Sequence, residues 1–138
     1  CLKVGIPGVS ENITVRSIVG NFLEHSRIYY FENGGTPEYY LSSADWMPRN
    51  LNRRVELLFP VEDPDCRARV KEVLDVELAD TVRAHFLSPD GSYHKLDLRG
   101  KEKVDSQQKL IDLADAAVAE RHKSIDKHEF IPEESPRD

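Results

Sequence analysis

The feature that most constrains the fold is a glycine-rich reversal, Asn33-Gly34-Gly35, between two short segments of strand-forming residues. These segments, residues 28–31 (IYYF) and 39–41 (YYL), are rich in aromatic and β-branched side chains, which favour extended structure. Asparagine and glycine adopt the positive φ angles of a tight turn at little cost. The sequence therefore predicts a β-hairpin over residues 25–43 with a glycine-rich tip.

Further strands are predicted on both sides of this hairpin. They are expected at residues 13–19, 55–61 and 82–86, where apolar and β-branched residues cluster or alternate. The turn sequence Pro89-Asp90-Gly91 then brings residues 92–96 back beside the last of these strands.

Two helices are predicted in the second half of the chain. One begins at Asp63-Pro64, because Asp is a favoured N-cap and Pro is favoured in the first helical turn. The other begins at Asp105 or Ser106, and apolar residues recur at helical spacing in both segments. The predicted class is therefore α/β, with a mixed β-sheet flanked by helices.

Length and charge limit the functions that such a chain can have. Its 138 residues are enough for one domain, and 19 basic against 25 acidic residues leave a formal net charge of −6. That balance argues against a general nucleic-acid binder, and no apolar run approaches the roughly 18 residues of a membrane-spanning helix. We expect one domain over residues 1–123 and a loose acidic tail over residues 124–138.

The two cysteines indicate reduced thiols in a cytoplasmic protein. Cys1 and Cys66 do not form a disulfide framework, and neither lies in the spacing of a metal site. An alternating apolar pattern starts directly after Cys1. We therefore expect Cys1 to be the cut edge of a larger protein, with part of any active site outside this chain.

The strongest candidate site is His25-Ser26-Arg27, directly before the first strand of the hairpin. Alternation along a strand would place His25 and Arg27 on one face. A guanidinium binds phosphoryl oxygens, and an imidazole can attack phosphorus or protonate a leaving oxygen. The alternative is a partly buried structural His beside an Arg that pairs with Glu24.

Residues after the hairpin could complete this site. Ser43 and Asp45 follow the returning strand, so they are expected near the imidazole, although either could simply cap the next helix. If residues 48–54 are helical, Arg49 and Arg53 share a face and could form a cradle for a polyanion. The alternative for these arginines is a solvated basic face.

A metal site and a nucleotide-binding loop are not predicted. The remaining histidines show no ligand spacing; they are His85, His94, His122 and His128. A glycine-rich phosphate loop of the G-x-x-x-x-G-K-[ST] type is also absent from the sequence.

Longer runs resemble a known family. The segments SIVGNFLEHSRIYYFENGG (17–35) and EYYLSSADWMPRNLNRRVELLFP (38–60) closely resemble the C-terminal catalytic domain of bacterial polyphosphate kinase. The segment CLKVGIPGVSENI (1–13) is also similar to that family, as are DGSYHK (90–95) and the helix containing Gln107. The resemblance covers residues 1–120 or so.

The resemblance implies a phospholipase-D-like fold, in which two similar domains each supply a histidine to one site. His25-x-Arg27 is similar to the His-x-Lys signature of that fold with Arg in place of Lys, and Ser43-Ala44-Asp45 resembles its Ser-x-Asn element. His25 would then be the catalytic acid–base group and would contact ATP. The binding residues would be His25, Arg27, Ser43, Asp45, Arg49 and Arg53.

The resemblance also implies the reaction and the partners. The reaction is reversible transfer of the ATP γ-phosphate to inorganic polyphosphate, with Mg²⁺ as cofactor in the intact enzyme. The phosphorylated histidine would lie in a preceding domain of the same polypeptide, so this chain alone should be inactive. We expect a homo-oligomer that binds ATP, ADP and polyphosphate but no nucleic acid, in the cytoplasm with or without peripheral membrane association.

Two other functions stay open at this point. One is a phospholipase-D-like phosphodiester hydrolase, which would need a full His-x-Lys-x₄-Asp motif; here Glu32 stands at the place of that Asp, and we assign it no catalytic role. The other is a non-catalytic polyanion-binding module. In an acidic chain such a module would need Arg27, Arg49 and Arg53 to be focused on one face.

Overall fold

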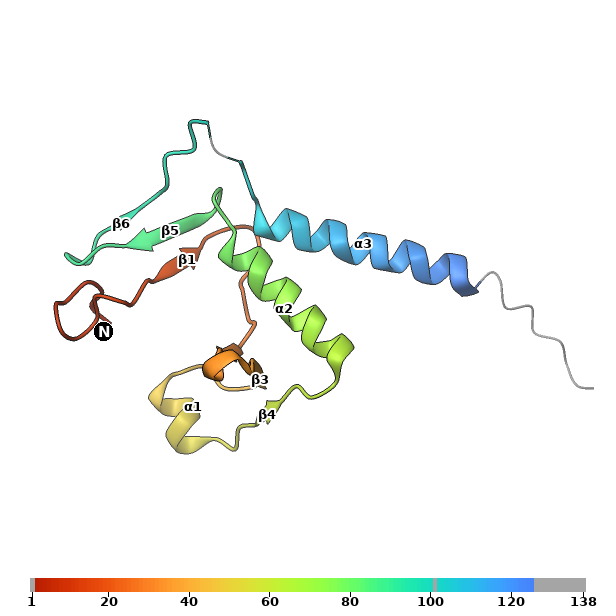
Figure 1. Ribbon diagram of the computed structural model, residues 1–138, viewed down its shortest axis with the longest axis horizontal. Helices are drawn as coiled ribbons and strands as arrows, with labels where there is room; N and C mark the ends of the chain where they lie inside the picture. The colour runs from red at the N-terminus through yellow and green to blue at the C-terminus, as the bar shows by residue number, and fades with distance from the viewer. Residues whose placement is uncertain (1, 101, 126–138) are drawn as a thin grey trace, which may run out of the picture.

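The computed structural model describes residues 2–100 and 102–125, and Figure 1 shows how they are arranged. The helices are α1 (Pro48–Arg53), α2 (Pro64–Leu78) and α3 (Ser106–Ile125). The strands are β1 (Arg16–Ile18), β2 (Ile28–Phe31), β3 (Glu38–Ser42), β4 (Leu58–Pro60), β5 (Ala84–Leu87) and β6 (Tyr93–His94). The predicted α/β class is confirmed.

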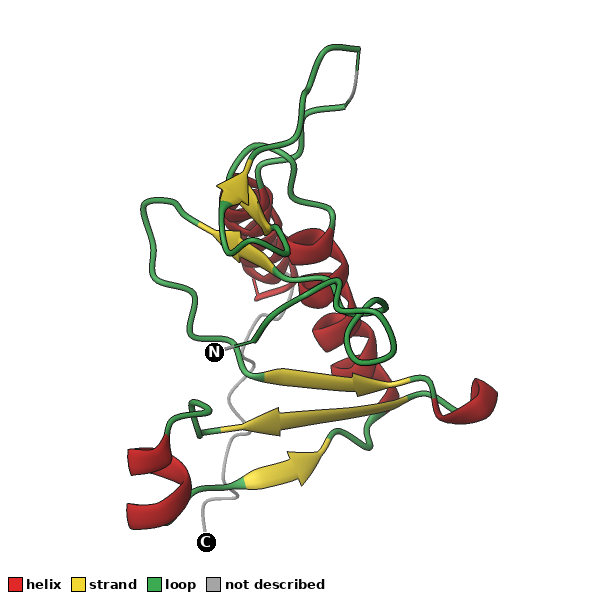
Figure 2. Cartoon of the chain, turned by 90° about the vertical axis from the view of Figure 1, so that its left-hand side faces the viewer, coloured by secondary structure: helices red, strands yellow, loops and turns green. Residues whose placement is uncertain are grey.

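The strands form two antiparallel sheets, where the sequence suggested one mixed sheet. One sheet has the order β1-β5-β6 and the other β2-β3-β4, and every paired strand in both is antiparallel. Helix α2 connects the two sheets, while α3 starts beside the first sheet and projects away from it (Figures 1 and 2). The separation arises because β1 pairs with the distant β5 and not with the hairpin that follows it.

The hairpin is formed as predicted. Its register pairs Ile28 with Leu41 and Phe31 with Glu38. Asn33 and Gly34 have φ angles of 45° and 63°, in the left-handed region that Asn and Gly tolerate best. The Asn33-Gly34-Gly35 reversal therefore determines where β2 ends and β3 begins.

Helix α2 also begins where the sequence predicts. The Oδ1 atom of Asp63 accepts a hydrogen bond of 2.8 Å from the backbone N–H of Cys66, and Pro64 occupies the first turn. The helix packs against one face of the second sheet, where a small depression is lined by Ile28, Leu41, Val70 and Val73 together with nearby polar residues. The opposite face of that sheet carries Tyr29 and Tyr40, the next residues in the register.

A buried carboxylate joins α2, β5 and α3. Asp80 is only 1% exposed, and its Oδ1 atom accepts from the backbone N–H groups of Arg83 (2.7 Å) and Ala84 (2.9 Å). Its Oδ2 atom accepts from the N–H of Ser106 (2.7 Å), the first residue of α3. A second contact, the ion pair between Arg83 and Asp105 at 2.7 Å, lies beside it. This junction therefore fixes the start of α3 against β5.

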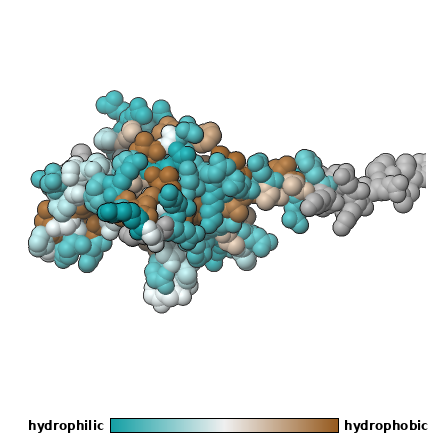
Figure 3. All heavy atoms as spheres, turned by 90° about the horizontal axis from the view of Figure 1, so that it is seen from above, coloured by the Kyte–Doolittle hydropathy of each residue, from teal (hydrophilic) through white to brown (hydrophobic). Residues whose placement is uncertain are grey.

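The hydrophobic core is small for a chain of this length. Within the described residues, six hydrophobic side chains are buried and twenty large ones are exposed. Figure 3 shows apolar surface emerging between polar residues over the body of the molecule. On the second sheet, the face that carries Tyr29 and Tyr40 lines a groove.

The predicted bounds of the first strand and of the C-terminal tail differ from the elements that the structure describes. The expected strand over residues 13–19 is shorter, because only Arg16–Ile18 pair with β5. The expected tail over residues 124–138 lies mostly outside the described residues, while α3 extends to Ile125. The proposed boundary at residue 123 therefore stays a prediction.

Replacing Asp80 should destabilise the chain strongly. Asp80→Ala leaves three backbone N–H groups without their acceptor, and we expect the free energy of unfolding to fall by about 2–4 kcal/mol in urea denaturation. The matched control is Asp115→Ala on an exposed position of α3, which should change it by less than about 0.5 kcal/mol. Equal effects of the two substitutions would contradict the role of Asp80.

The same carboxylate should make stability depend on pH. Burial tends to raise the pKa of Asp80, but the hydrogen bonds from Ser106, Arg83 and Ala84 outweigh burial and lower it. A lowered pKa means that the stabilisation is present above about pH 4 and is lost as the pH falls through the folded-state value. Asp80→Ala should lack this part of the acid sensitivity.

Candidate functional site

His25 lies in the loop that connects β1 to β2. Strand β2 begins only at Ile28, so the expected alternation of His25 and Arg27 along a strand is wrong. Before β2 begins, one backbone hydrogen bond to β3 remains: the N–H of Ser42 donates to the carbonyl of Arg27 at 3.0 Å. His25 is exposed, and within the described part of the chain its imidazole makes no hydrogen bond. Its ring is therefore free to meet a ligand.

Arg27 is held by Asp45. The Nε and Nη2 atoms of Arg27 both donate to Oδ1 of Asp45, at 2.8 and 2.6 Å, and Nη1 donates to the backbone carbonyl of His25 at 3.0 Å. The pair is partly shielded, with 22% of the Arg27 side chain and 41% of the Asp45 side chain exposed. A guanidinium has five N–H groups, and these contacts leave two of them for a ligand.

The expected partnership between Asp45 and the imidazole of His25 is not what the structure shows. Asp45 binds the side chain of Arg27 and reaches His25 only through it. Nor does Arg27 pair with Glu24, the structural alternative. Asp45 does not cap α1 either, because the N-cap is Met47 and makes no side-chain cap.

Ser43 has a structural partner of its own. Its hydroxyl donates to the carboxylate of Glu56 and accepts from the N–H of Leu57 at 3.0 Å. The backbone N–H of Ser43 also donates to the carbonyl of Leu57 at 3.0 Å. Ser43 thus ties the end of β3 to the segment that leads into β4, and no contact joins it to His25 in the described residues.

No contact among the described residues holds Arg49 and Arg53 together as the polyanion cradle that the sequence suggested. Arg49 and Arg53 both lie on α1 and are exposed, and among the described residues neither makes a hydrogen bond or an ion pair. Helix α1 is anchored instead by its buried Asn50, whose Nδ2 atom donates to the carbonyl of Asp45 at 3.3 Å. A role for the two arginines in binding therefore stays a prediction.

Gln107 holds the segment before His25. The Oε1 atom of Gln107 accepts from the N–H groups of Asn21 (2.9 Å) and Phe22 (3.3 Å), and Nε2 donates to the Phe22 carbonyl (2.8 Å) and to Oε1 of Glu24 (2.7 Å). The sequence analysis missed these contacts. The family resemblance included the helix that contains Gln107, but a polar residue in the first turn of a helix was not expected to be buried.

Glu77 of α2 lies against the same loop. Burial raises the pKa of Glu77, the neighbouring charge of Glu24 raises it further, and a hydrogen bond with Ser26 acts in the opposite direction. This carboxyl therefore keeps its proton more readily than an ordinary glutamate does. Its position beside Glu24 and Ser26 was also not predicted.

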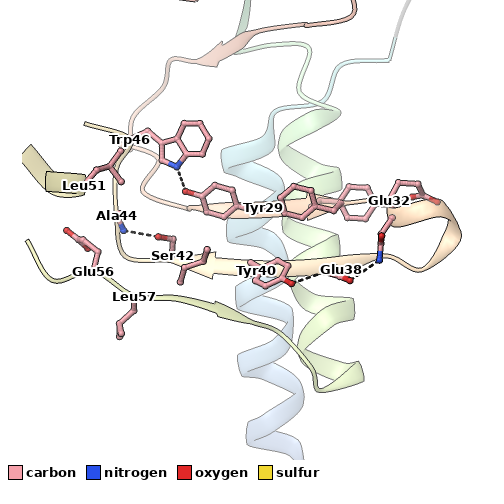
Figure 4. A pocket seen from close by; sticks show the side chains of 14 residues that line it. Tyr29, Glu32, Glu38, Tyr40, Ser42, Ala44, Trp46, Leu51, Glu56 and Leu57 are labelled. Carbon is pink, nitrogen blue, oxygen red and sulfur yellow. Dashed lines mark hydrogen bonds between the residues drawn. The ribbon is translucent and has the colours of Figure 1, made fainter. Parts of the chain in front are cut away.

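An apolar groove of about 890 Å³ lies on the face of the second sheet that carries Tyr29 and Tyr40. Figure 4 shows its aromatic side chains along β2 and β3, with the indole N–H of Trp46 donating to the hydroxyl of Tyr29 at 2.6 Å. Its charged lining residues are acidic: Glu32, Glu38 and Glu56. Such a surface suits an apolar partner and disfavours a polyphosphate. A smaller depression of about 350 Å³ contains Arg27 and Asp45.

Comparisons with known proteins agree on one family. The family model for "Polyphosphate kinase C-terminal domain 2" matches residues 1–107. This chain belongs to the polyphosphate kinase family. The polyphosphate kinase of Lactiplantibacillus plantarum is 50% identical over 99% of the chain, and polyphosphate kinase 1 of Chlorobaculum tepidum is 56% identical over 80% of it.

A solved structure supports the same assignment. The crystal structure of polyphosphate kinase from Porphyromonas gingivalis matches 81% of this chain with a TM-score of 0.73 and 34% sequence identity. The match confirms the predicted phospholipase-D-like α/β class. The chain spans 20% of the L. plantarum protein, 16% of the C. tepidum protein and 18% of the P. gingivalis chain.

The described residues lack the features of a metal site and of a membrane-spanning helix. They contain no group of three His, Cys, Asp or Glu side chains arranged to hold a metal ion. Within residues 2–100 and 102–125, no helix combines the length and apolar character that a membrane crossing requires.

The Arg27–Asp45 contact should be measurable as a coupling. In a double-mutant cycle of Arg27→Ala and Asp45→Ala, unfolding of the 138-residue chain should give a coupling energy of about 0.5–1 kcal/mol, because the pair is partly exposed. Molar salt should reduce this value. Additive effects of the two substitutions would contradict the pairing described here.

Proposed function

We propose that this chain forms the C-terminal catalytic domain of a polyphosphate kinase, which transfers the γ-phosphate of ATP reversibly to inorganic polyphosphate. The observation that carries the proposal is the match of residues 1–107 to the polyphosphate kinase C-terminal domain, with relatives of that name 50% and 56% identical. Because the chain spans only 16–20% of these relatives, it would act together with the remaining domains of the same polypeptide.

His25 is the proposed acid–base group. Imidazole is the side chain that gives and takes protons most readily near neutral pH, and that of His25 is exposed and without a hydrogen-bond partner among the described residues. In phosphoryl transfer, charge develops on the bridging oxygen as the bond to phosphorus breaks. A protonated His25 would stabilise that oxygen, and the neutral ring would take the proton back in the reverse direction.

Arg27 would assist as a fixed positive charge. Its two remaining N–H groups can bind phosphoryl oxygens, while the two hydrogen bonds to Asp45 fix the orientation of the guanidinium. In this proposal Asp45 acts on Arg27, and Ser43 supports the end of β3. Arg49 and Arg53 would meet the extended polyphosphate further along, where their side chains are exposed.

Mg²⁺ as the cofactor of the intact enzyme stays a prediction. The described residues contain no group of three or more His, Cys, Asp or Glu side chains that could hold a metal ion by themselves. We therefore derive no step through Mg²⁺. A homo-oligomeric state, a cytoplasmic location and peripheral membrane association also stay predictions.

The two alternative functions have less support. In a phospholipase-D-like hydrolase, an Asp would be needed at position 32, but Glu32 lies at the far end of β2 and accepts a hydrogen bond from the hydroxyl of Tyr30. A polyanion-binding module would need its arginines joined in one cluster. Arg27 is paired with Asp45, and among the described residues no contact joins it to Arg49 or Arg53 on α1.

A hybrid enzyme tests the proposed function. In this hybrid, residues 1–138 replace the matching region of the L. plantarum polyphosphate kinase, which aligns with 99% of the chain. We expect the purified hybrid to form ATP from ADP and polyphosphate, and the 138-residue chain alone to be inactive. A hybrid that shows the thermal transition of the L. plantarum protein but no ATP formation would refute the proposal.

In the active hybrid, His25→Ala should reduce the rate more than it weakens binding. Loss of a positioned acid–base group costs about 10²–10⁴-fold in rate, so kcat for ATP formation should fall by that factor with a small change in KM. The control is His94→Ala, because His94 is exposed, stacks on Phe86 and bonds to Ser88. If His94→Ala abolished activity and His25→Ala did not, the site would belong to the β6 strand instead.

The apolar groove is the proposed docking surface for the remaining domains of the same polypeptide. It lies on the sheet face opposite α2, and the relatives are five or more times longer than this chain. Its lining contains Glu32, Glu38 and Glu56, so two copies of the groove would bring like charges together. An apolar segment with basic flanks, supplied by the remaining polypeptide, satisfies both the aromatic and the acidic residues.

Substitution in this groove should matter only in the longer protein. Leu57 lines the groove and is 66% exposed, so Leu57→Ser should leave the 138-residue chain within about 0.5 kcal/mol of its original stability. In the hybrid it should cost about 1.5–3 kcal/mol, because the side chain becomes buried. Val55→Ser is the matched control, at a 98% exposed position outside the groove.

An unchanged hybrid would refute docking of the remaining polypeptide at this face. If Leu57→Ser instead converted a dimer of the 138-residue chain to a monomer, the occupant would be a second copy.

A further inference from the structure

A single buried side chain, that of Gln107, forms hydrogen bonds with the segment that leads into His25. Gln107 is 4% exposed and lies in the first turn of α3, more than eighty residues along the chain from its partners. It makes four hydrogen bonds, to the backbone of Asn21 and Phe22 and to the carboxylate of Glu24. The last of these partners is the residue directly before His25.

Only a primary amide of this length can make the complete set of bonds. The oxygen accepts two N–H groups, and the NH₂ group donates to one carbonyl and one carboxylate, so both donors and both acceptor positions are used. A glutamate would lack the donors and would repel Glu24. A methionine has a similar length but forms none of these bonds.

The two residues before Gln107 are themselves held by other elements of the fold. The N–H of the preceding residue, Ser106, is bound by the buried Asp80, and Asp105 is paired with Arg83. On the other side the loop approaches closely at Gly20, where a Cβ atom would lie 2.3 Å from Oε1 of Gln107. A Cβ atom at position 20 would therefore displace the Gln107 amide from this position.

The loop around His25 is thus held from both directions. Gln107 fixes residues 21–24 on its N-terminal side. On its C-terminal side, Arg27 bonds to the carbonyl of His25 and is itself held by Asp45. The imidazole, which has no partner of its own among the described residues, depends on these two backbone anchors for its position.

We propose that Gln107 is a positioning residue, which sets the place of the His25 imidazole for proton transfer by anchoring residues 21–24. This inference rests on the proposed function of His25. A displacement of about 1 Å at a reacting group can cost up to 10²-fold in rate, so loss of the anchor reduces the rate of chemistry without removing any group that touches the substrate.

The activity test compares Gln107→Met with Gln108→Met in the hybrid enzyme. Gln108 is the exposed neighbour, whose amide donates to Asp112 on the same helix, so Gln108→Met should keep the original kcat. Gln107→Met should lower kcat by about 10–100-fold with less than about a threefold change in KM. A Gln107→Met enzyme that is folded and has the original kcat would overturn the inference.

A second variant and a second measurement keep the test independent of folding and of activity. Gly20→Ala keeps Gln107 but forces its amide away, and it should cause a similar loss of kcat. In the 138-residue chain, hydrogen exchange at the amides of Asn21 and Phe22 should be slow and should accelerate at least tenfold in Gln107→Met, with Gln108→Met unchanged.

These measurements distinguish a failure of the proposed function from a failure of the proposed role of Gln107. If the unmodified hybrid is inactive, the proposed function fails, while the exchange data still decide whether Gln107 anchors the loop. If the hybrid is active and exchange at Asn21 and Phe22 is the same in Gln107→Met, the anchor does not exist and the inference fails.

Discussion

The buried carboxylate of Asp80 is the interaction on which the rest of the structure depends. It binds backbone N–H groups at the start of β5 and at the start of α3, directly after α2 has ended. A buried charge is tolerated only when such donors satisfy it, so these elements must meet at one point. The small hydrophobic core could not specify that meeting point alone. The position of Gln107, and through it the loop before His25, follows from this junction.

The elements could be predicted where the signals are local. Asn33-Gly34-Gly35 predicts the hairpin because positive φ angles are confined to a few residue types, and Asp63-Pro64 predicts the start of α2 because the cap acts within one turn. The arrangement of the strands was less accessible. The pairing of β1 with β5 joins residues such as Ser17 and His85, and it depends on how the whole chain folds. The single mixed sheet was therefore replaced by two antiparallel ones.

The candidate site shows the same limit. The sequence predicted that Asp45 would lie near the imidazole of His25, but in the structure its carboxylate binds the guanidinium of Arg27. Gln107 was not recognised because its partners are backbone groups far along the chain. The family resemblance is the source of the chemistry proposed for His25, whereas the structure shows the contacts that support the loop carrying it.

The most direct test is a crystal structure of the hybrid enzyme with a non-hydrolysable ATP analogue. The account predicts that a phosphate oxygen lies within hydrogen-bond distance of the His25 imidazole, with Arg27 nearby and with residues 21–24 still bound by Gln107. A nucleotide bound instead at Tyr93–His94, or at His25 with the loop released from Gln107, would contradict it.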